Sequence, residues 1–227
     1  LQPPAGIPEA VRREVEALAR GERVAGRRAR PPERAHGLTT AVRLGDRTAT
    51  SLLIGRLSAM RDERNPAPLR LAAVVALGRL VGADLADGST RLLEGTGAAK
   101  LLEERATKGP WYMRGFGAIG WALAARGVAV GPDAPGIQHE RDARHALRRM
   151  LQTRTLEPDL RSAAAVGLGL MGAPETSPDL RAAVANPAND TDLRADAALA
   201  LGQVVRPLAA DDAEVVATLE AATVQNG

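Results

Sequence analysis

Three histidines are the first residues to examine for chemistry. The chain contains no cysteine, which excludes disulfides, thiolate metal ligands and a cysteine nucleophile. His139 and His145 lie in the segment HERDARH but are six residues apart, so they do not share a helix face as the histidines of the HExxH zinc motif do. His36 lies about a hundred residues away, and no grouping of serine, histidine and acid stands out. We therefore expect no catalytic site, no metal site and no cofactor.

A glycine-rich segment, GFGAIG at 115–120, has the glycine spacing of a dinucleotide-binding loop. That loop needs a preceding strand and the start of a helix, because its glycines let the backbone approach a pyrophosphate. No strand pattern precedes this segment, and it lies inside a helical pattern. The sequence therefore predicts a protein that is not an enzyme.

Aromatic residues are confined to one window of eleven positions. Tyr112, Phe116 and Leu123 share one face of a helix with Ile119. Aromatic side chains commonly anchor protein partners, so this face is a candidate recognition surface. In the alternative interpretation, the neighbouring segment 126–139 folds over the face and buries it. The window holds Trp111, Tyr112, Phe116 and Trp121.

Basic residues form a second candidate site. Arg141, Arg144 and Arg148 recur at spacings of three and four, which places them on one helix face. Their guanidinium groups would suit a phosphate-bearing ligand or an acidic peptide. The alternative is a solvated face that is partly paired with Glu140 and Asp142.

A repeat supplies the elements that must position these residues. Strands favour aromatic and β-branched residues, whereas the 45% of apolar residues here include only four aromatics, so the composition favours helix. One pattern, an apolar residue, then arginine, then an alanine-rich segment, occurs four times. The copies are LRLAAVVALG from Leu69, MRGFGAIGWA from Met113, LRSAAAVGLG from Leu160 and LRADAALALG from Leu193, and their arginines are Arg70, Arg114, Arg161 and Arg194.

Helical periodicity predicts what each copy does. Positions −1, +3 and +7 from the arginine share one face, which we expect to form the core and to include Trp121 at +7. Positions +4 and +8 are mostly small, so a neighbouring helix can approach closely. Insertions are expected at 82–97 and 126–139, and the Gly and Pro positions of the second forbid a continuous helix. A partner helix is expected before each copy, at about 47–60, 97–107, 139–152 and 178–186, with a further helix at 211–223.

The copies DTDLRADAALALG from Asp190 and EPDLRSAAAVGLG from Glu157 resemble the second helix of the HEAT repeat, in the short bacterial form first described in phycobilin lyases. The resemblance covers about residues 44–224. It implies an all-α fold, a right-handed α-solenoid of about four HEAT-like hairpins. It also implies that the four repeat arginines form structural hydrogen-bond ladders between successive repeats.

The function expected from this fold is a protein–protein interaction or assembly scaffold that binds a partner protein or a neighbouring subunit. A phycobilin-lyase-like accessory enzyme and a nucleic-acid-binding protein are the alternatives. Nucleic acid is disfavoured because charge is divided along the chain. Residues 1–155 hold 26 basic and 16 acidic side chains, whereas residues 156–227 hold 4 and 11. Such a division can steer partners or favour head-to-tail association.

The chain is expected to divide into an N-terminal part, 1–37, and a HEAT-like repeat domain, 38–227. The first part would hold a helix at 8–20 and an Arg- and Pro-rich linker at 21–37. Charge-free apolar runs fall short of the ~18 residues of a membrane span. Because residue 1 is leucine, a mature exported protein and a fragment of a longer chain both remain open, and the sequence predicts no compartment.

Overall fold

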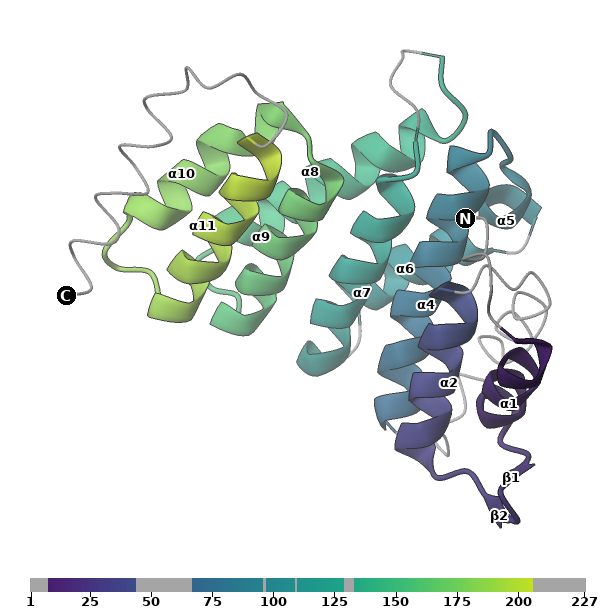
Figure 1. Cartoon of the computed structure of the whole chain (residues 1–227). Coiled ribbons are helices and arrows are strands. Elements are labelled where there is room, and N and C mark those ends of the chain that lie inside the picture. Colours follow the sequence, from purple (N-terminus) through teal and green to yellow (C-terminus); the bar gives the residue numbers. More distant parts are fainter. Residues whose placement is uncertain (1–7, 44–66, 96, 109, 129–132, 206–227) are drawn as a thin grey trace.

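The computed structural model describes residues 8–43, 67–95, 97–108, 110–128 and 133–205 (Figure 1). Within these ranges the chain is all-α apart from one short β-hairpin, and its helices pack pairwise. The all-α prediction is therefore confirmed. The elements are α1 (Glu9–Arg20), β1 (Arg23–Val24), β2 (Arg27–Arg28), α2 (Pro31–Arg43), α4 (Ala67–Ala86), α5 (Arg91–Gly95), α6 (Ala98–Thr107), α7 (Trp111–Ala125), α8 (Ile137–Gln152), α9 (Pro158–Met171), the 3₁₀ turn η2 (Pro174–Thr176), α10 (Ser177–Ala185) and α11 (Thr191–Val205).

The four arginine-led copies form four successive helices, α4, α7, α9 and α11. Each repeat arginine is the fourth residue of its helix, so the copies begin at equivalent places. These helices lie side by side in one layer, which we call the arginine layer (Figure 1). Helices α6, α8 and α10 pack against α7, α9 and α11 from behind and form the second layer. The predicted partner helices at 97–107, 139–152 and 178–186 are confirmed to within two residues.

The core lies between the two layers and is built from the predicted helix faces. The +7 residues Leu77, Trp121, Leu168 and Leu201 are all buried. Leu102 and Leu180, from the second layer, are buried against them. The prediction that Trp121 belongs to the core is thus confirmed.

Small residues set the contact between neighbouring helices of the arginine layer. The residue at +8 of one copy meets the residue at +6 of the next. A Cβ atom built on Gly78 would collide with the carbonyl group of Gly120, so the backbones of α4 and α7 touch there. Gly169 meets the backbone of Ala200 in the same way, whereas Gly167 packs against the Cβ atom of Ala122. Glycine is required at these junctions because a side chain would push the helices apart.

The N-terminal part differs from its prediction. Helix α1 matches the expected 8–20, but the predicted linker 21–37 is wrong for residues 31–37, which are helical. Prolines are tolerated in the first helical turn, so the pair that suggested a linker instead begins α2. Helix α2 packs on both α1 and α4, and Gly37 lets it approach the backbone of Ala19. The array thus extends one hairpin further toward the N-terminus than the four expected copies.

The insertion predicted at 82–97 is also partly wrong. Helix α4 continues to Ala86, because Gly82 does not break it but packs against the carbonyl of Leu123. Helix α5 follows, and the Asp84 carboxylate accepts a hydrogen bond from the Leu92 backbone N–H at 2.9 Å. Likewise, α8 begins at Ile137, so the last residues of the insertion expected at 126–139 are helical. The helices expected at 47–60 and 211–223 lie outside the described residues.

Candidate interaction surface

Exposed aromatic side chains mark the N-terminal half of α7. Trp111, Tyr112 and Phe116 are 53%, 38% and 40% exposed. The rings of Trp111 and Tyr112 meet edge to face, with centroids 6.0 Å apart. The alternative in which segment 126–139 covers this face is wrong for Tyr112 and Phe116, since both are exposed.

Helix α7 turns these aromatics away from the second layer because its core face is already filled. Met113 and Trp121, at −1 and +7, are buried between the layers. Tyr112 and Phe116, at −2 and +2, lie on another side of the helix. Leu123, at +9, is half-buried further along that side.

An apolar row crosses the arginine layer and was missed in the sequence. The fifth residue after each repeat arginine is aliphatic in all four copies, and none of the four is fully buried. Leu199 is the most accessible, with 68% of its surface exposed. The repeated +5 position was the available signal. The members of the apolar row are Val75, Ile119, Val166 and Leu199.

The apolar row is broadened on α7 and α9. Phe116 lies beside it on α7, where the equivalent position of α9 holds the small Ala163. Leu123 and Leu170, both half-buried, flank the row at +9. On α11 the +2 residue is Asp196, so the surface becomes polar there. We call the apolar row together with Tyr112, Phe116, Leu123 and Leu170 the apolar surface.

The arginine stripe on α8 is largely engaged within the molecule. The Arg148 Nε atom lies 2.6 Å from an Asp179 carboxylate oxygen on α10. Arg144 pairs with Glu140 at 3.4 Å and also with Glu175 in η2. Burial raises the pKa of Glu140, although the charges of Arg144 and Arg141 oppose that rise. Arg144 and Arg148 therefore tie α8 to the following hairpin, and Arg141 is the exposed member of the stripe.

Two repeat arginines make the same structural contact. The Nε group of Arg161 donates to the Leu151 carbonyl, and that of Arg194 donates to the Val184 carbonyl, both at 3.0 Å. Each acceptor lies ten residues earlier, on the penultimate residue of the preceding helix. Arg161 also donates to Asn189 of the next repeat at 3.0 Å, so it links successive hairpins as the resemblance implies.

The other arginines depart from this ladder. The Nε group of Arg114 is buried without a hydrogen-bond partner. The connection before its helix is also shorter, because only residues 108–110 separate α6 from α7, whereas five residues separate α8 from α9. Arg34 is the fourth residue of α2 and packs against Gly21, directly after α1 ends. Arg34 therefore occupies the place of a repeat arginine in a copy that the sequence pattern did not reveal.

His139 and Trp121 form a buried ring pair between α8 and α7, with centroids 6.1 Å apart. Burial lowers the pKa of His139 to about 4, although the nearby Asp142 carboxylate opposes this. His139 is thus neutral at physiological pH. In the part of the chain that the structure describes, no group of three or more His, Asp or Glu side chains is placed to hold a metal ion.

Comparison with known proteins gives a likeness of fold only. No family model and no curated protein matches the chain. Among solved structures, it is similar to human deoxyhypusine hydroxylase in complex with glycerol, a HEAT-repeat protein. That match has 18% sequence identity and a TM-score of 0.30 over 95% of this chain and 96% of the other, and no function is taken from it. Among helices in the described ranges, none is both long and apolar enough to cross a bilayer.

Proposed function

We propose that this protein is a non-catalytic interaction module whose apolar surface binds a segment of a partner protein. One observation carries the proposal: four successive helices present an aliphatic side chain at the same incompletely buried position, beside the exposed Tyr112 and Phe116. Exposed apolar side chains that gather on one face often mark an interaction site, and here Tyr112, Phe116 and Leu199 are exposed while the rest of the apolar surface is half-buried. Two aromatic anchors at its centre are typical of residues that dominate binding energy.

The geometry of the apolar row suggests the form of the partner. Packed helices lie roughly 8–10 Å apart, so the row repeats at about that distance. Every seventh residue of an α-helix recurs at about 10.5 Å, given a rise of 1.5 Å per residue. A partner helix with apolar residues at heptad spacing would therefore meet the row once per helix. Phe116 and Tyr112 would pack beside it near the middle.

A photo-crosslinking experiment tests the proposal. Benzoylphenylalanine is placed at residue 116 and, in a matched control, at residue 149, an exposed position on α8 in the second layer. We expect residue 116, and not residue 149, to crosslink one partner protein through a segment with apolar residues at heptad spacing. The purified partner should then bind at least tenfold more weakly to the Tyr112→Ser/Phe116→Ser variant.

Other outcomes would contradict the proposal. Equal amounts of crosslinked product at positions 116 and 149 would mean that the partner has no preference for the apolar surface. A product joining two copies of this chain would assign the surface to a neighbouring subunit instead of a partner protein. Unchanged affinity in both Tyr112→Ser/Phe116→Ser and Leu199→Ser would remove the surface from the interaction altogether.

A further inference from the structure

A cavity lined by arginines lies at the opposite end of the array from α11. It measures about 580 Å³ and is open to solvent at the β1–β2 hairpin. Its polar lining comes mainly from four arginines and Glu22. The lining arginines are Arg20, Arg23, Arg27 and Arg28.

The hairpin beside this cavity is unfavourable by itself. Arg23 pairs directly across the strands with Arg28, and like charges in such a position repel each other. Its turn places Ala25 at φ 48° and Gly26 at φ 80°, so a residue with a side chain occupies the left-handed region. A two-stranded hairpin of this length is not stable without outside support.

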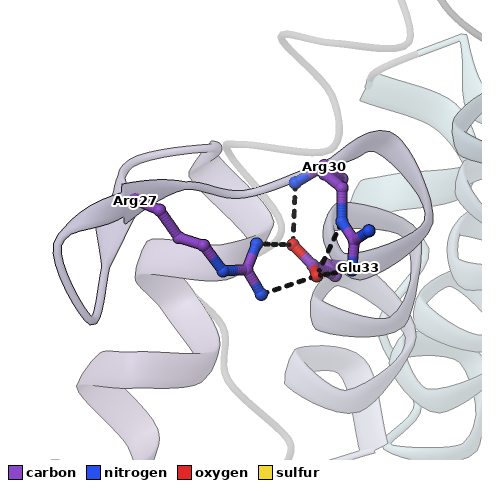
Figure 2. A network of polar contacts seen from close by, with 3 residues as sticks. All are labelled: Arg27, Arg30 and Glu33. Carbon is purple, nitrogen blue, oxygen red and sulfur yellow. Dashed lines mark hydrogen bonds and ion pairs between the residues drawn. The ribbon is translucent and has the colours of Figure 1, made fainter.

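The support comes from Glu33 in the first turn of α2 (Figure 2). Its two carboxylate oxygens accept hydrogen bonds from both Nη groups of Arg27, each at 2.8 Å. The backbone N–H of Arg30 donates to Glu33 at 2.8 Å, and its side chain donates at 2.9 Å. These donors hold the pKa of Glu33 far below its usual range. The hairpin is therefore fixed to α2 in spite of its internal repulsion.

The pairing of charges around the cavity is uneven. Arg20 lies 3.0 Å from the Glu16 carboxylate, and Arg27 is paired with Glu33. Within the described residues, no carboxylate pairs with Arg23 or Arg28, and both are exposed. Strain retained at a rigidly held site is a recognised mark of function. The two cross-strand arginines thus line one cavity without a paired carboxylate of their own, although Glu22 also belongs to the lining.

We propose that this cavity binds a phosphomonoester group between Arg23 and Arg28. Residues directly opposite on paired strands project to the same face with Cβ atoms about 5 Å apart, close enough for one tetrahedral anion to bridge their guanidinium groups. A phosphomonoester carries about −1.5 to −2 charges at pH 7 and three acceptor oxygens, so it neutralises both arginines. The bound anion would convert cross-strand repulsion into attraction.

The surroundings favour a compact anion over nucleic acid. Binding to a nucleic-acid backbone relies on many spread phosphate contacts. Here the adjacent helix α1 pairs two of its own arginines with carboxylates, Arg13 with Glu9 and Arg20 with Glu16. The described residues of the hairpin include no aromatic side chain on which a base could stack.

Isothermal titration with three probes tests the proposal: inorganic phosphate, a phosphoserine peptide of otherwise neutral sequence, and the same peptide without phosphate. We expect the wild-type protein to bind both phosphate-bearing probes and not the unmodified peptide. Arg23→Gln/Arg28→Gln should weaken binding at least tenfold. Arg149→Gln/Arg154→Gln removes the same charge from exposed positions at the end of α8 and just after it, and should change affinity less than twofold. Tighter binding of the peptide than of inorganic phosphate would identify a phosphorylated protein as the source of the group.

Thermal unfolding measurements distinguish a loss of phosphate binding from a loss of folding. Removing the arginine repulsion should leave the unfolding temperature of Arg23→Gln/Arg28→Gln unchanged or slightly raised. Phosphate should raise that temperature in the wild type and not in this variant. The proposal fails if neither phosphate probe binds at millimolar concentration, or if both double variants lose affinity equally. It also fails if a DNA duplex binds more tightly than the phosphopeptide with a steep salt dependence.

Discussion

Gly169 of α9 lies so close to Ala200 of α11 that a Cβ atom on Gly169 would stand 2.6 Å from the Ala200 Cα. No side-chain rearrangement can relieve that contact, because the obstructing atom belongs to the backbone. We expect Gly169→Ala to lower the free energy of unfolding by about 1–3 kcal/mol through overpacking. Urea unfolding followed by circular dichroism measures the change.

Gly202 provides the matched control on α11. A Cβ atom there would meet nothing within 4 Å, so Gly202→Ala should gain helix propensity without a clash. We expect it to raise the free energy of unfolding by about 0.5–1 kcal/mol. Equal effects of the two substitutions would contradict the close approach of α9 and α11.

Acid should destabilise the protein through His139. Its pKa falls from 6.5 to about 4 on folding, so protonation favours the unfolded state. The stabilisation is complete above pH 6.5 and disappears as the pH falls to 4, a loss of about 3 kcal/mol at 1.36 kcal/mol per pKa unit. Unfolding measured across this range should show a shallower pH dependence for His139→Gln than for the wild type. His145→Gln, at an exposed site on the same helix, should follow the wild type.

The hydrogen bond from Arg194 to the Val184 carbonyl should stabilise the last hairpin. Arg194→Leu removes a charged donor from a partly buried carbonyl, which costs about 1.5–3 kcal/mol. Arg149→Leu, on an exposed part of α8, should change stability by less than about 0.5 kcal/mol. Thermal or urea unfolding compares the two, and a similar effect at both sites would argue against a structural role for Arg194.

Trp121 and Phe116 should respond differently to truncation although they lie on the same helix. Trp121 is 3% exposed, so Trp121→Ala should lower the free energy of unfolding by about 3–5 kcal/mol. Phe116 is 40% exposed, and Phe116→Ala should cost less than about 1 kcal/mol. If Phe116→Ala unfolds at the same low denaturant concentration as Trp121→Ala, then Phe116 belongs to the core and not to the proposed apolar surface.

Periodicity predicted the parts of the fold that repeat. The core residues Leu168 and Leu201 could be placed from their distance to Arg161 and Arg194, because a helix returns to the same face every three to four residues. Glycine was the weak point of this reasoning. The insertion expected at 82–97 begins at Gly82, whereas Gly82 lies within α4 and admits the neighbouring backbone, and spacing alone does not distinguish these two uses of glycine.

The N-terminal copy was hidden because it departs from the pattern at more than one position. Val42, at +8 from Arg34, stands where the other copies have a small residue. The other four copies have an apolar residue before the arginine, but Glu33 precedes Arg34 because its carboxylate holds the hairpin. The pairing of Arg144 with Glu140 was anticipated, whereas the ion pairs that join the α8 stripe to the next hairpin were out of reach. Arg148 meets Asp179 from 31 residues away, so their contact depends on how the hairpins stack.

The apolar surface became visible only when the four helices were placed side by side. In each copy separately, the aliphatic +5 residue looks like an ordinary part of an amphipathic helix. Aligning Val75 with Leu199 shows that it lies on one side of every helix in the layer. The exposed aromatics of α7 were predicted as candidates, whereas their continuation onto the neighbouring helices was not.

The glycine junctions give the apolar row its pitch. No two of its members share a helix, so the distance from one to the next is fixed by how far neighbouring backbones interpenetrate at contacts such as Gly78 with Gly120 and Gly169 with Ala200. A methyl group added at one junction would stretch a single interval and leave the others intact. Residues that a bound chain does not touch would thereby set which spacing of apolar residues in that chain fits the apolar row. The distance between neighbouring backbones would then determine which partner segments bind.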